Sequence, residues 1–390
     1  MNNGQIVFSQ LLNFLPMRRF QICVDRYGGN ARIRNFSCHD HFLTMIFAQL
    51  AFRESLRGII ASLNYSPVSL YHMGFRCKKV SRTTLAKANE IRSWQIYADF
   101  ASILISIARK LYANDPILPQ LDSTVYALDS TTIDLCLSMF PWAKFRRSKG
   151  AVKVHTLMNL RGSIPEFIHI SDGKMRDVRF LDLLLPQPGA YYVMDRGYID
   201  FSRLYALHQA KAFFVTRAFA RQAIQRRYSH SVDKTTGLQC DQTIMLTGPI
   251  SKQKYPEPLR RIKFYDAQNN KRLVFLTNNF ELPAMTIALL YKSRWEIEGF
   301  FKWIKQHLRI KSFFGTSENA VKTQIWTAVC AYVLIAIIKK RLALDQSLYR
   351  ILQILSLVLF DKRPILQVLS EPIYSFEEPD MYKQLPLLNF

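Results

Sequence analysis

The chain has 390 residues, 49% of them apolar and 21% charged, without a low-complexity or repeated segment. These proportions exclude a disordered or fibrous chain, and the length exceeds what one hydrophobic core usually organises, so more than one domain is expected. Lys and Arg number 53 against 29 Asp and Glu, which gives a formal net charge of +24. Such an excess of cations favours a polyanionic partner, and nucleic acid fits it best.

The cysteines and the apolar segments argue against two further classes of protein. The six cysteines are scattered without a Cys-x-x-Cys pair, which disfavours disulfides and zinc. Cys38, His39 and His41 lie close together but lack further ligands nearby, and they are better explained as the start of a helix. The most apolar window, 325–338, is about 14 residues long where a membrane span needs about 20, so it indicates a buried helix. With no signal-peptide pattern at the N-terminus, we expect a cytoplasmic protein and no membrane partner.

Residues 1–115 are predicted to be α-helical. Apolar side chains recur at helical spacing in the segments 6–16, 41–52 and 94–111. Ser81 stands where a helix N-cap is expected, so a helix-turn-helix that reads DNA is one interpretation. A plain helical bundle with a basic face is the other.

From residue 116 the pattern changes to that of an α/β core. Alternating or β-rich runs at 124–129, 151–160 and 163–171 predict strands, with a tight turn at Arg161-Gly162 between the last two. The next expected elements are a short helix over 178–185, a strand over 190–195, a helix over 201–210 and a strand over 212–218.

The rest of the chain is divided by a change in composition. Between residues 219 and 272, polar strand-like runs separated by Gly, Pro and Asn turns predict an inserted β region. A buried strand over 272–278 follows, then strongly helical sequence over 282–344, and then a proline-containing tail predicted as a short helix and coil. The predicted units are 1–115, 116–218, 219–272, 273–345 and 346–390.

Two aspartates follow apolar strands, Asp129 in YALDST and Asp195 in YYVMDRGY. The ends of strands in α/β sheets commonly present groups to a ligand, which makes both aspartates candidates for catalysis. Asp before Ser-Thr or Arg-Gly is also an ordinary turn or helix-cap residue, so neither identifies a site by itself.

A third carboxylate lies in the helical sequence 291–308, on a face whose residues are spaced by three or four and span an arc of about 80°. The residues on this face are Tyr291, Arg294, Glu298, Lys302 and Lys305. An exposed face of ion pairs worth about 0.2–0.5 kcal/mol each is the ordinary explanation. A carboxylate flanked by cations, in a chain with two strand-end aspartates, could instead hold metal and phosphate together.

With these residues the chain resembles the DDE transposases of bacterial insertion sequences, in the group numbered four. The signature of that group is Tyr, two residues, Arg, three residues, Glu, six residues and Lys, matched here by Tyr291, Arg294, Glu298 and Lys305. LDST and MDRGY resemble the family's two aspartate motifs, so the resemblance implies a catalytic triad of Asp129, Asp195 and Glu298. It covers about residues 120–345 and implies an RNase H-like core with a β-strand insertion, preceded by an α-helical DNA-binding region.

The resemblance also implies an activity and its partners. The expected reaction is metal-dependent cleavage at the ends of a mobile element and strand transfer into target DNA, with two Mg²⁺ or Mn²⁺ ions held by the triad. The implied partners are double-stranded DNA, at the inverted-repeat ends and at the target, and a second copy of the chain in a synaptic complex. The implied location is the bacterial cytoplasm, at the nucleoid.

Further DNA contacts are expected around the triad. On the helix face, Arg294, Lys302 and Lys305 would face phosphates, and Tyr291 would contribute its hydroxyl. Trp295 would stack on a flipped terminal base during hairpin formation, with burial against the core as the alternative. Relatives also use a Trp in the β insertion, which this chain lacks, so Phe264 or Tyr265 would have to substitute.

A basic segment at residues 144–153 is predicted to be a loop. Its cations Arg146, Arg147 and Lys149 either follow the backbone of bound DNA or are simply solvated. Two rival functions also stay open: an RNase H-like nuclease that cuts without joining, and a non-catalytic DNA-binding protein derived from a transposase.

Overall fold

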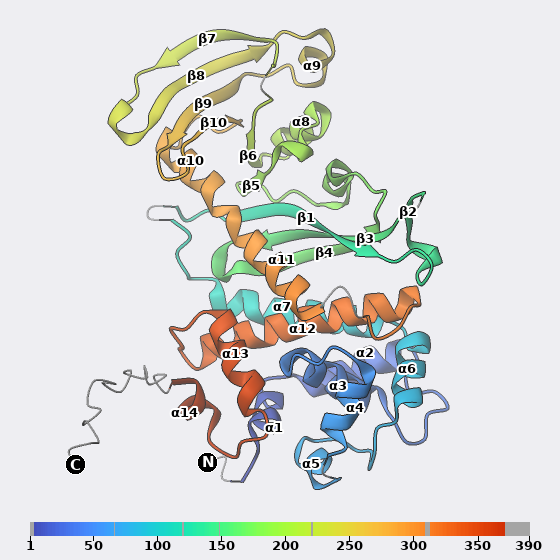
Figure 1. Cartoon of the computed structure of the whole chain (residues 1–390). Helices are drawn as coiled ribbons and strands as arrows, with labels where there is room; N and C mark the ends of the chain where they lie inside the picture. The colour runs from blue at the N-terminus through green and yellow to red at the C-terminus, as the bar shows by residue number, and fades with distance from the viewer. Residues whose placement is uncertain are drawn as a thin grey trace, which may run out of the picture.

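The computed structural model describes residues 4–65, 67–118, 121–147, 149–219, 221–308 and 313–370. Three layers follow one another along the long axis of the molecule (Figure 1). A helical region lies at one end, a sheet flanked by helices lies in the middle, and a β extension forms the other end.

The N-terminal part of the chain is helical, as predicted. Ser37, Ser55 and Ser81 each cap a helix by accepting a backbone N–H of its first turn. The sequence at Cys38 is therefore a helix start, and both ring nitrogens of His41 are engaged by buried neighbours, Tyr97 and Asn89. The helices are α1 (Val7–Leu12), α2 (Met17–Arg26), α3 (Cys38–Leu50), α4 (Leu56–Leu63), α5 (Pro67–His72), α6 (Arg82–Ile91) and α7 (Gln95–Tyr112).

The central layer is a mixed sheet of the RNase H-like kind that the family resemblance implies. Strand β1 pairs antiparallel with β3, which pairs antiparallel with β4, while β1, β5 and β6 run parallel. The alternating and buried apolar runs of the sequence account for these strands. Their bounds are β1 Val125–Leu135, β2 Lys144–Arg146, β3 Lys149–Asn159, β4 Ile164–Asp172, β5 Tyr191–Met194 and β6 Phe213–Arg217.

The β insertion continues the core sheet. Strand β10 pairs with β6 of the core on one side and with β9 of the insertion on the other, giving one 10-stranded sheet with the order β2-β3-β1-β5-β6-β10-β9-β8-β7 and β4 paired to β3. The extension consists of β7 (Ile224–His230), β8 (Leu238–Leu246), β9 (Leu259–Asp266) and β10 (Lys271–Thr277), with a short helix α9 (Pro249–Lys254) that the sequence did not predict.

Short turns and helices connect and follow these strands. The predicted helix over 178–185 is a 3₁₀ helix, and helix 201–210 is confirmed as α8 (Phe201–Gln209). The predicted tail helix is two helices, and the predicted coil lies outside the described residues. The 3₁₀ segments are Pro141–Ala143, Arg161–Ser163, Asp177–Leu183, Arg196–Tyr198 and Lys234–Thr236, and the remaining helices are α10 (Ala284–Ser293), α11 (Trp295–Leu308), α12 (Glu318–Arg341), α13 (Leu348–Val358) and α14 (Ile365–Ser370).

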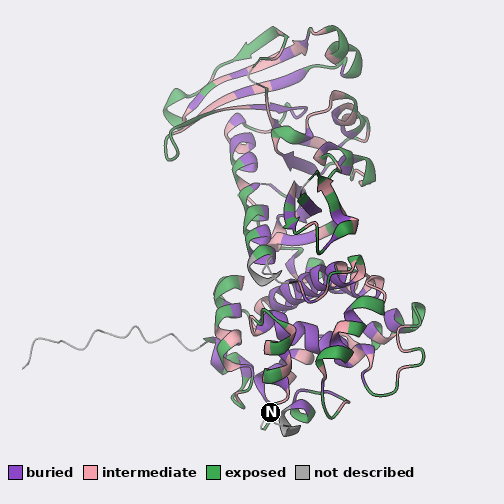
Figure 2. Cartoon of the chain, turned by 45° about the vertical axis from the view of Figure 1, so that its right-hand side comes forward, coloured by how far each residue is buried: buried purple, intermediate pink, exposed green. Residues whose placement is uncertain are grey.

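Helix α12 joins the helical region to the sheet. It is long and apolar enough to cross a membrane by composition, but 94% of its most apolar window is buried inside the protein, which confirms the predicted buried helix (Figure 2). It packs against α3, α6, α7 and α11. At its start, the side chain of Asn319 donates to the carbonyls of Asn89 and Arg92 and accepts from the backbone N–H of Trp94. The helical region is therefore fixed to the core by packing and by hydrogen bonds.

A buried ion pair fixes the β extension. The guanidinium of Arg260 on β9 binds both carboxylate oxygens of Asp241 on β8, at 2.9 and 2.7 Å, and both residues are buried. Its remaining nitrogen donates to the carbonyl of Leu282 at 2.6 Å, just before α10. This arginine therefore connects two strands of the extension to the segment that leads into α10.

Replacing Asp241 with Asn is expected to lower the free energy of unfolding by about 3–5 kcal/mol, because Arg260 would be left buried without a counter-charge. Chemical denaturation of the purified protein measures the change. The matched control is Asp182→Asn, which removes an exposed partner of Arg203 and should cost about 1 kcal/mol or less. Equal losses in the two variants would contradict the assigned role of the buried pair.

Candidate active site

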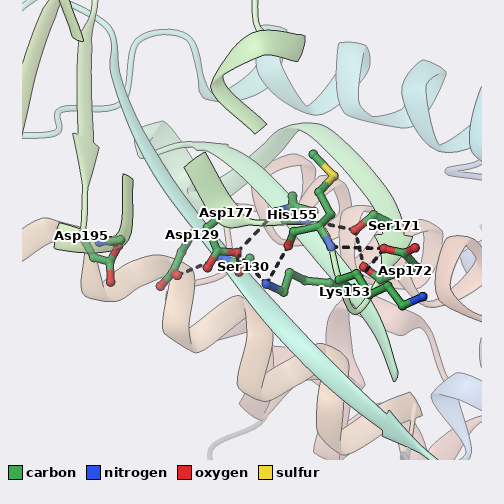
Figure 3. Close-up of polar contacts among 11 residues, drawn as sticks. Asp129, Ser130, Lys153, His155, Ser171, Asp172, Asp177 and Asp195 are labelled. Carbon is green, nitrogen blue, oxygen red and sulfur yellow. Dashed lines mark hydrogen bonds and ion pairs between the residues drawn. The ribbon is translucent and has the colours of Figure 1, made fainter. Parts of the chain in front are cut away.

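Strand register places two of the predicted residues side by side. The parallel pairing of β1 with β5 ends at Leu128 opposite Met194, and Asp129 and Asp195 are the next residue on each strand. Neighbouring strands lie about 4.8 Å apart, so the two aspartates occupy adjacent positions (Figure 3). Asp195 ends its strand as predicted and accepts the N–H of Gly197 at 2.8 Å. Asp129 instead lies within the 11-residue strand β1, which continues beyond the point where β5 ends.

One arginine connects the third carboxylate to this pair. Arg294 donates from Nη1 to Oδ2 of Asp129 at 2.8 Å and from Nη2 to Oε1 of Glu298 at 2.9 Å. The guanidinium is largely buried, so both bonds are charge-assisted in a medium of reduced dielectric constant. Arg294 therefore brings Glu298 of α11 next to Asp129 of β1.

The helix that carries these residues is broken at Arg294. Sequence spacing predicted continuous helical sequence, but α10 ends at Ser293 and α11 begins at Trp295. The N–H of Arg294 bonds the carbonyl of Tyr291, three residues back, and the N–H of Ile297 bonds the carbonyl of Arg294. Such tight bonds turn the chain at this point.

The break divides the predicted helix face into a buried and an exposed part. Tyr291 is buried against Phe275, with ring centroids 4.8 Å apart, and lies beside the guanidinium of Arg294. The later positions are exposed: Glu298, Lys302 and Lys305. An open cavity of about 500 Å³ is lined by these three residues together with Asp129, Ser130, Thr131 and Phe301. Carboxylates and lysines thus face one concave space.

Burial and the neighbouring charges change the protonation of Asp129. The pKa of Asp129 is raised to about 6, chiefly by burial and to a smaller extent by nearby Asp195 and Glu298, while Arg294 and the Ser130 N–H oppose the change. Hard oxygen ligands of this kind suit a divalent ion. Among the described residues, no three His, Cys, Asp or Glu side chains already form a metal-binding set.

Comparison with known proteins identifies the family. A family model described as the transposase DDE domain matches residues 120–334, and one described as a domain of unknown function matches residues 3–76. The chain is 33% identical over 249 residues to a putative transposase of Sinorhizobium fredii, covering 63% of this chain and 69% of the relative. The chain belongs to the DDE transposase family.

More distant relatives have similar names. A probable transposase for an insertion sequence element of Geobacillus stearothermophilus is 30% identical over 212 residues, covering 53% of this chain and 55% of that protein. A putative insertion-sequence transposase of Synechocystis is 26% identical over 277 residues, covering 68% and 74%. The cryo-EM structure of a piggyBac transposase synaptic complex with hairpin DNA aligns with a TM-score of 0.46 and 10% identity, covering 86% of this chain and 72% of that chain, a likeness too low to support an argument. Family membership makes this transposase a DNA-cleaving and strand-transferring enzyme that uses divalent metal ions.

A polar network behind Asp129 was not predicted from the sequence (Figure 3). The backbone N–H of Ser130 donates to Asp129 at 2.8 Å, and the hydroxyl of Ser130 donates to Asp177. Lys153 donates to the same oxygen of Asp177 at 3.1 Å. Burial lowers the pKa of neighbouring His155 to about 4, so its ring is neutral at pH 7. In the transposase this network fixes the strand residue that follows Asp129.

The basic segment of the transposase is a hairpin, so the predicted loop is wrong. Strand β2 pairs antiparallel with the start of β3, where Lys144 lies opposite Gly150 and Arg146 opposite Lys149. The side chains of Arg146, Arg147 and Lys149 are exposed, and none forms an ion pair within the described ranges. Lys153 belongs to the same basic run but is bound to Asp177 instead of facing solvent.

The aromatic candidates of the transposase differ in exposure. Trp295 is 56% exposed, so burial against the core does not occur. Phe264 packs on the hydrophobic core, and the hydroxyl of Tyr265 donates to Asn270. Of these three side chains, Trp295 presents the most accessible ring.

Replacing Asp177 with Asn is expected to slow DNA cleavage by about 10- to 100-fold, because Lys153 and Ser130 lose the carboxylate that fixes them behind Asp129. Single-turnover cleavage of a labelled end duplex measures the rate, and filter binding measures DNA affinity. Asp182→Asn, on the same 3₁₀ helix, is the control and should leave the rate unchanged. An unchanged rate in Asp177→Asn would show that the network has no positioning role.

Proposed function

We propose that Asp129, Asp195 and Glu298 are the catalytic triad of this transposase and hold two Mg²⁺ or Mn²⁺ ions. The observation that carries the proposal is the shared guanidinium of Arg294, which bonds Asp129 and Glu298, next to the strand position of Asp195. Three carboxylates within electrostatic reach of one another carry more negative charge than a single arginine neutralises. Divalent cations supply the missing positive charge.

The proposed chemistry assigns separate tasks to these side chains. Bound ions would supply an activated hydroxyl and charge relief for the leaving oxygen of the phosphodiester. Arg294, once it releases a carboxylate, can donate two parallel hydrogen bonds to a phosphate. Lys302 and Lys305 are exposed at the same cavity and would hold the DNA backbone beside the ions.

We also propose the finer partners and units. The DNA is duplex at the inverted-repeat ends and at the target, and two copies of the chain join two ends in the cytoplasm, at the nucleoid. Residues 1–115 form a DNA-binding region before a core at 116–218 and 273–345, with the insertion at 219–272 and a helical tail at 346–390. The spacing of Tyr291 to Glu298 supports membership of group four. The ends of the element would form DNA hairpins, with a flipped terminal base stacked on Trp295.

The triad predicts three inactive variants. Asp129→Asn, Asp195→Asn and Glu298→Gln should each abolish cleavage while end binding is retained, because each loses a metal ligand without a change of shape. The purified protein is incubated with its own element ends and Mg²⁺, and nicks, hairpins and joined products are resolved on a denaturing gel. Addition of EDTA to the wild type should give the same loss.

Two control variants keep the same elements and remove other carboxylates. Glu296→Gln lies on α11, where its side chain accepts from Ser163, and Asp134→Asn lies further along β1. Both should cleave like the wild type. Full activity in any one triad variant would refute the assignment, and cleavage without joined products in the wild type would favour a nuclease.

The basic hairpin predicts a change in the salt dependence of binding. Replacing Arg146, Arg147 and Lys149 with Ala should reduce the slope of log K against log[salt] by about 0.9 for each phosphate that the protein no longer neutralises. Fluorescence anisotropy of an end duplex between low and moderate salt measures it. A variant lacking the exposed Arg350 and Lys362 is the control. An unchanged slope in the hairpin variant would leave these side chains as solvated cations.

A further inference from the structure

A second cavity lies where the core sheet continues into the β extension. Its volume is about 210 Å³, and its other lining residues are mainly apolar, with Phe219 at the beginning of the extension. Arginines from four separate segments line it: Arg196 after β5, Arg217 at the end of β6, Arg261 on β9 and Arg272 on β10. The continuous strand ladder from β6 through β10 to β9 therefore brings these cations together.

The positive charge of this cavity is not balanced by the protein. No carboxylate lines the cavity, and none of its four arginines forms an ion pair in the part of the chain that the structure describes. Arg261 donates only to the neutral side chain of Gln242 and, weakly, to the sulfur of Cys240. By contrast, adjacent Arg260 is bound by Asp241, and Arg294 is bound by two carboxylates. The guanidinium groups around so small a cavity repel one another unless an anion binds between them.

A second observation also indicates a ligand. The amide nitrogen and oxygen of Gln222, which lines the cavity, are buried and have no hydrogen-bond partner among the described residues. A buried amide without a partner is costly, and an oxyanion in the cavity could accept from its nitrogen. The planar guanidinium fork matches the oxygens of a phosphate.

We propose that this arginine pocket, formed by Arg196, Arg217, Arg261 and Arg272, binds backbone phosphates of the DNA strand that enters the active site. Arg196 directly follows Asp195, so a bound phosphate lies close to the reacting phosphodiester. The volume is below the roughly 300–1,000 Å³ of sites for drug-sized ligands, which suits phosphate groups better than a base pair. The proposal rests on the proposed function of Asp195. The pocket fixes the register of the strand and reads no sequence.

The test measures binding without chemistry. Full-length protein with Arg217→Gln and Arg272→Gln is titrated with a labelled end duplex in EDTA at several salt concentrations. The slope of log K against log[salt] should become shallower by about 1.8, since each phosphate that an arginine neutralises contributes about 0.9 to its magnitude. Duplexes carrying one neutral methylphosphonate each then locate the phosphate that the pocket binds. The methylphosphonate that weakens binding by the wild type should not weaken binding by the Gln variant any further.

Two further variants test whether the effect depends on the position and the charge of these arginines. Arg226→Gln with Arg227→Gln removes the same charge from exposed positions on β7 and should retain the wild-type slope and methylphosphonate pattern. Arg217→Lys with Arg272→Lys keeps the charge and should restore most of the slope. A wild-type pattern in the Gln variant, or an equal change in the β7 variant, would overturn the proposal.

Other outcomes distinguish DNA phosphate from free phosphate, and the pocket proposal from the catalytic proposal. Inorganic phosphate could raise the melting temperature of the wild type but not of the Gln variant, while both proteins show the same methylphosphonate pattern. In that case the pocket binds a free anion, and the assignment to DNA is overturned. Cleavage is measured separately with Mg²⁺. A wild type that shows the predicted phosphate contact but does not cleave contradicts the catalytic proposal alone.

Discussion

The candidate site depends on one guanidinium. Arg294 lies between Asp129 and Glu298 and bonds both, and without it three neighbouring carboxylates would repel one another in a partly buried space. The break between α10 and α11 at this residue turns its side chain toward β1. Arg294 uses one lone pair of Oδ2 of Asp129, so the carboxylate keeps further lone pairs with which it could bind a metal ion. Part of the negative charge of the site is thus balanced by a cation of the protein itself.

Strand pairing extends this organisation beyond the triad. The register between β1 and β5 sets Asp129 beside Asp195, and the next pairings carry the sheet through β6 and β10 into the extension. The buried pair of Arg260 and Asp241 then ties the extension to the segment before α10. The arginine pocket and the two aspartates of the proposed triad are therefore fixed relative to each other by hydrogen-bonded strands, which would suit two contacts with one DNA strand.

Much of this arrangement could be predicted from local patterns, and the remainder depends on contacts between distant residues. Apolar periodicity located most of the strands, the N-terminal helices and the buried helix α12, and Asp195 was placed correctly at a strand end, but β2 was predicted as part of a loop. Asp129 lies inside β1 because the antiparallel pairing with β3 continues to Leu135, beyond the point where the parallel pairing with β5 ends. Lys153 belongs to a basic run in the sequence, but its side chain is paired to Asp177, 24 residues away. Composition alone cannot show such pairings.

The insertion has no tryptophan, and the aromatic rings that could replace it differ in exposure. Phe264 and Tyr265 are only partly exposed, and Phe264 packs on the core, whereas Trp295 is 56% exposed and presents the most accessible ring. Phe219 was not considered from the sequence, yet it is 45% exposed and lines the arginine pocket. Base stacking needs an accessible aromatic face beside a held backbone. Trp295 beside Arg294 and Phe219 beside the arginine pocket are both exposed, so under the two proposals a flipped base would find an aromatic ring at each place where the strand would be held.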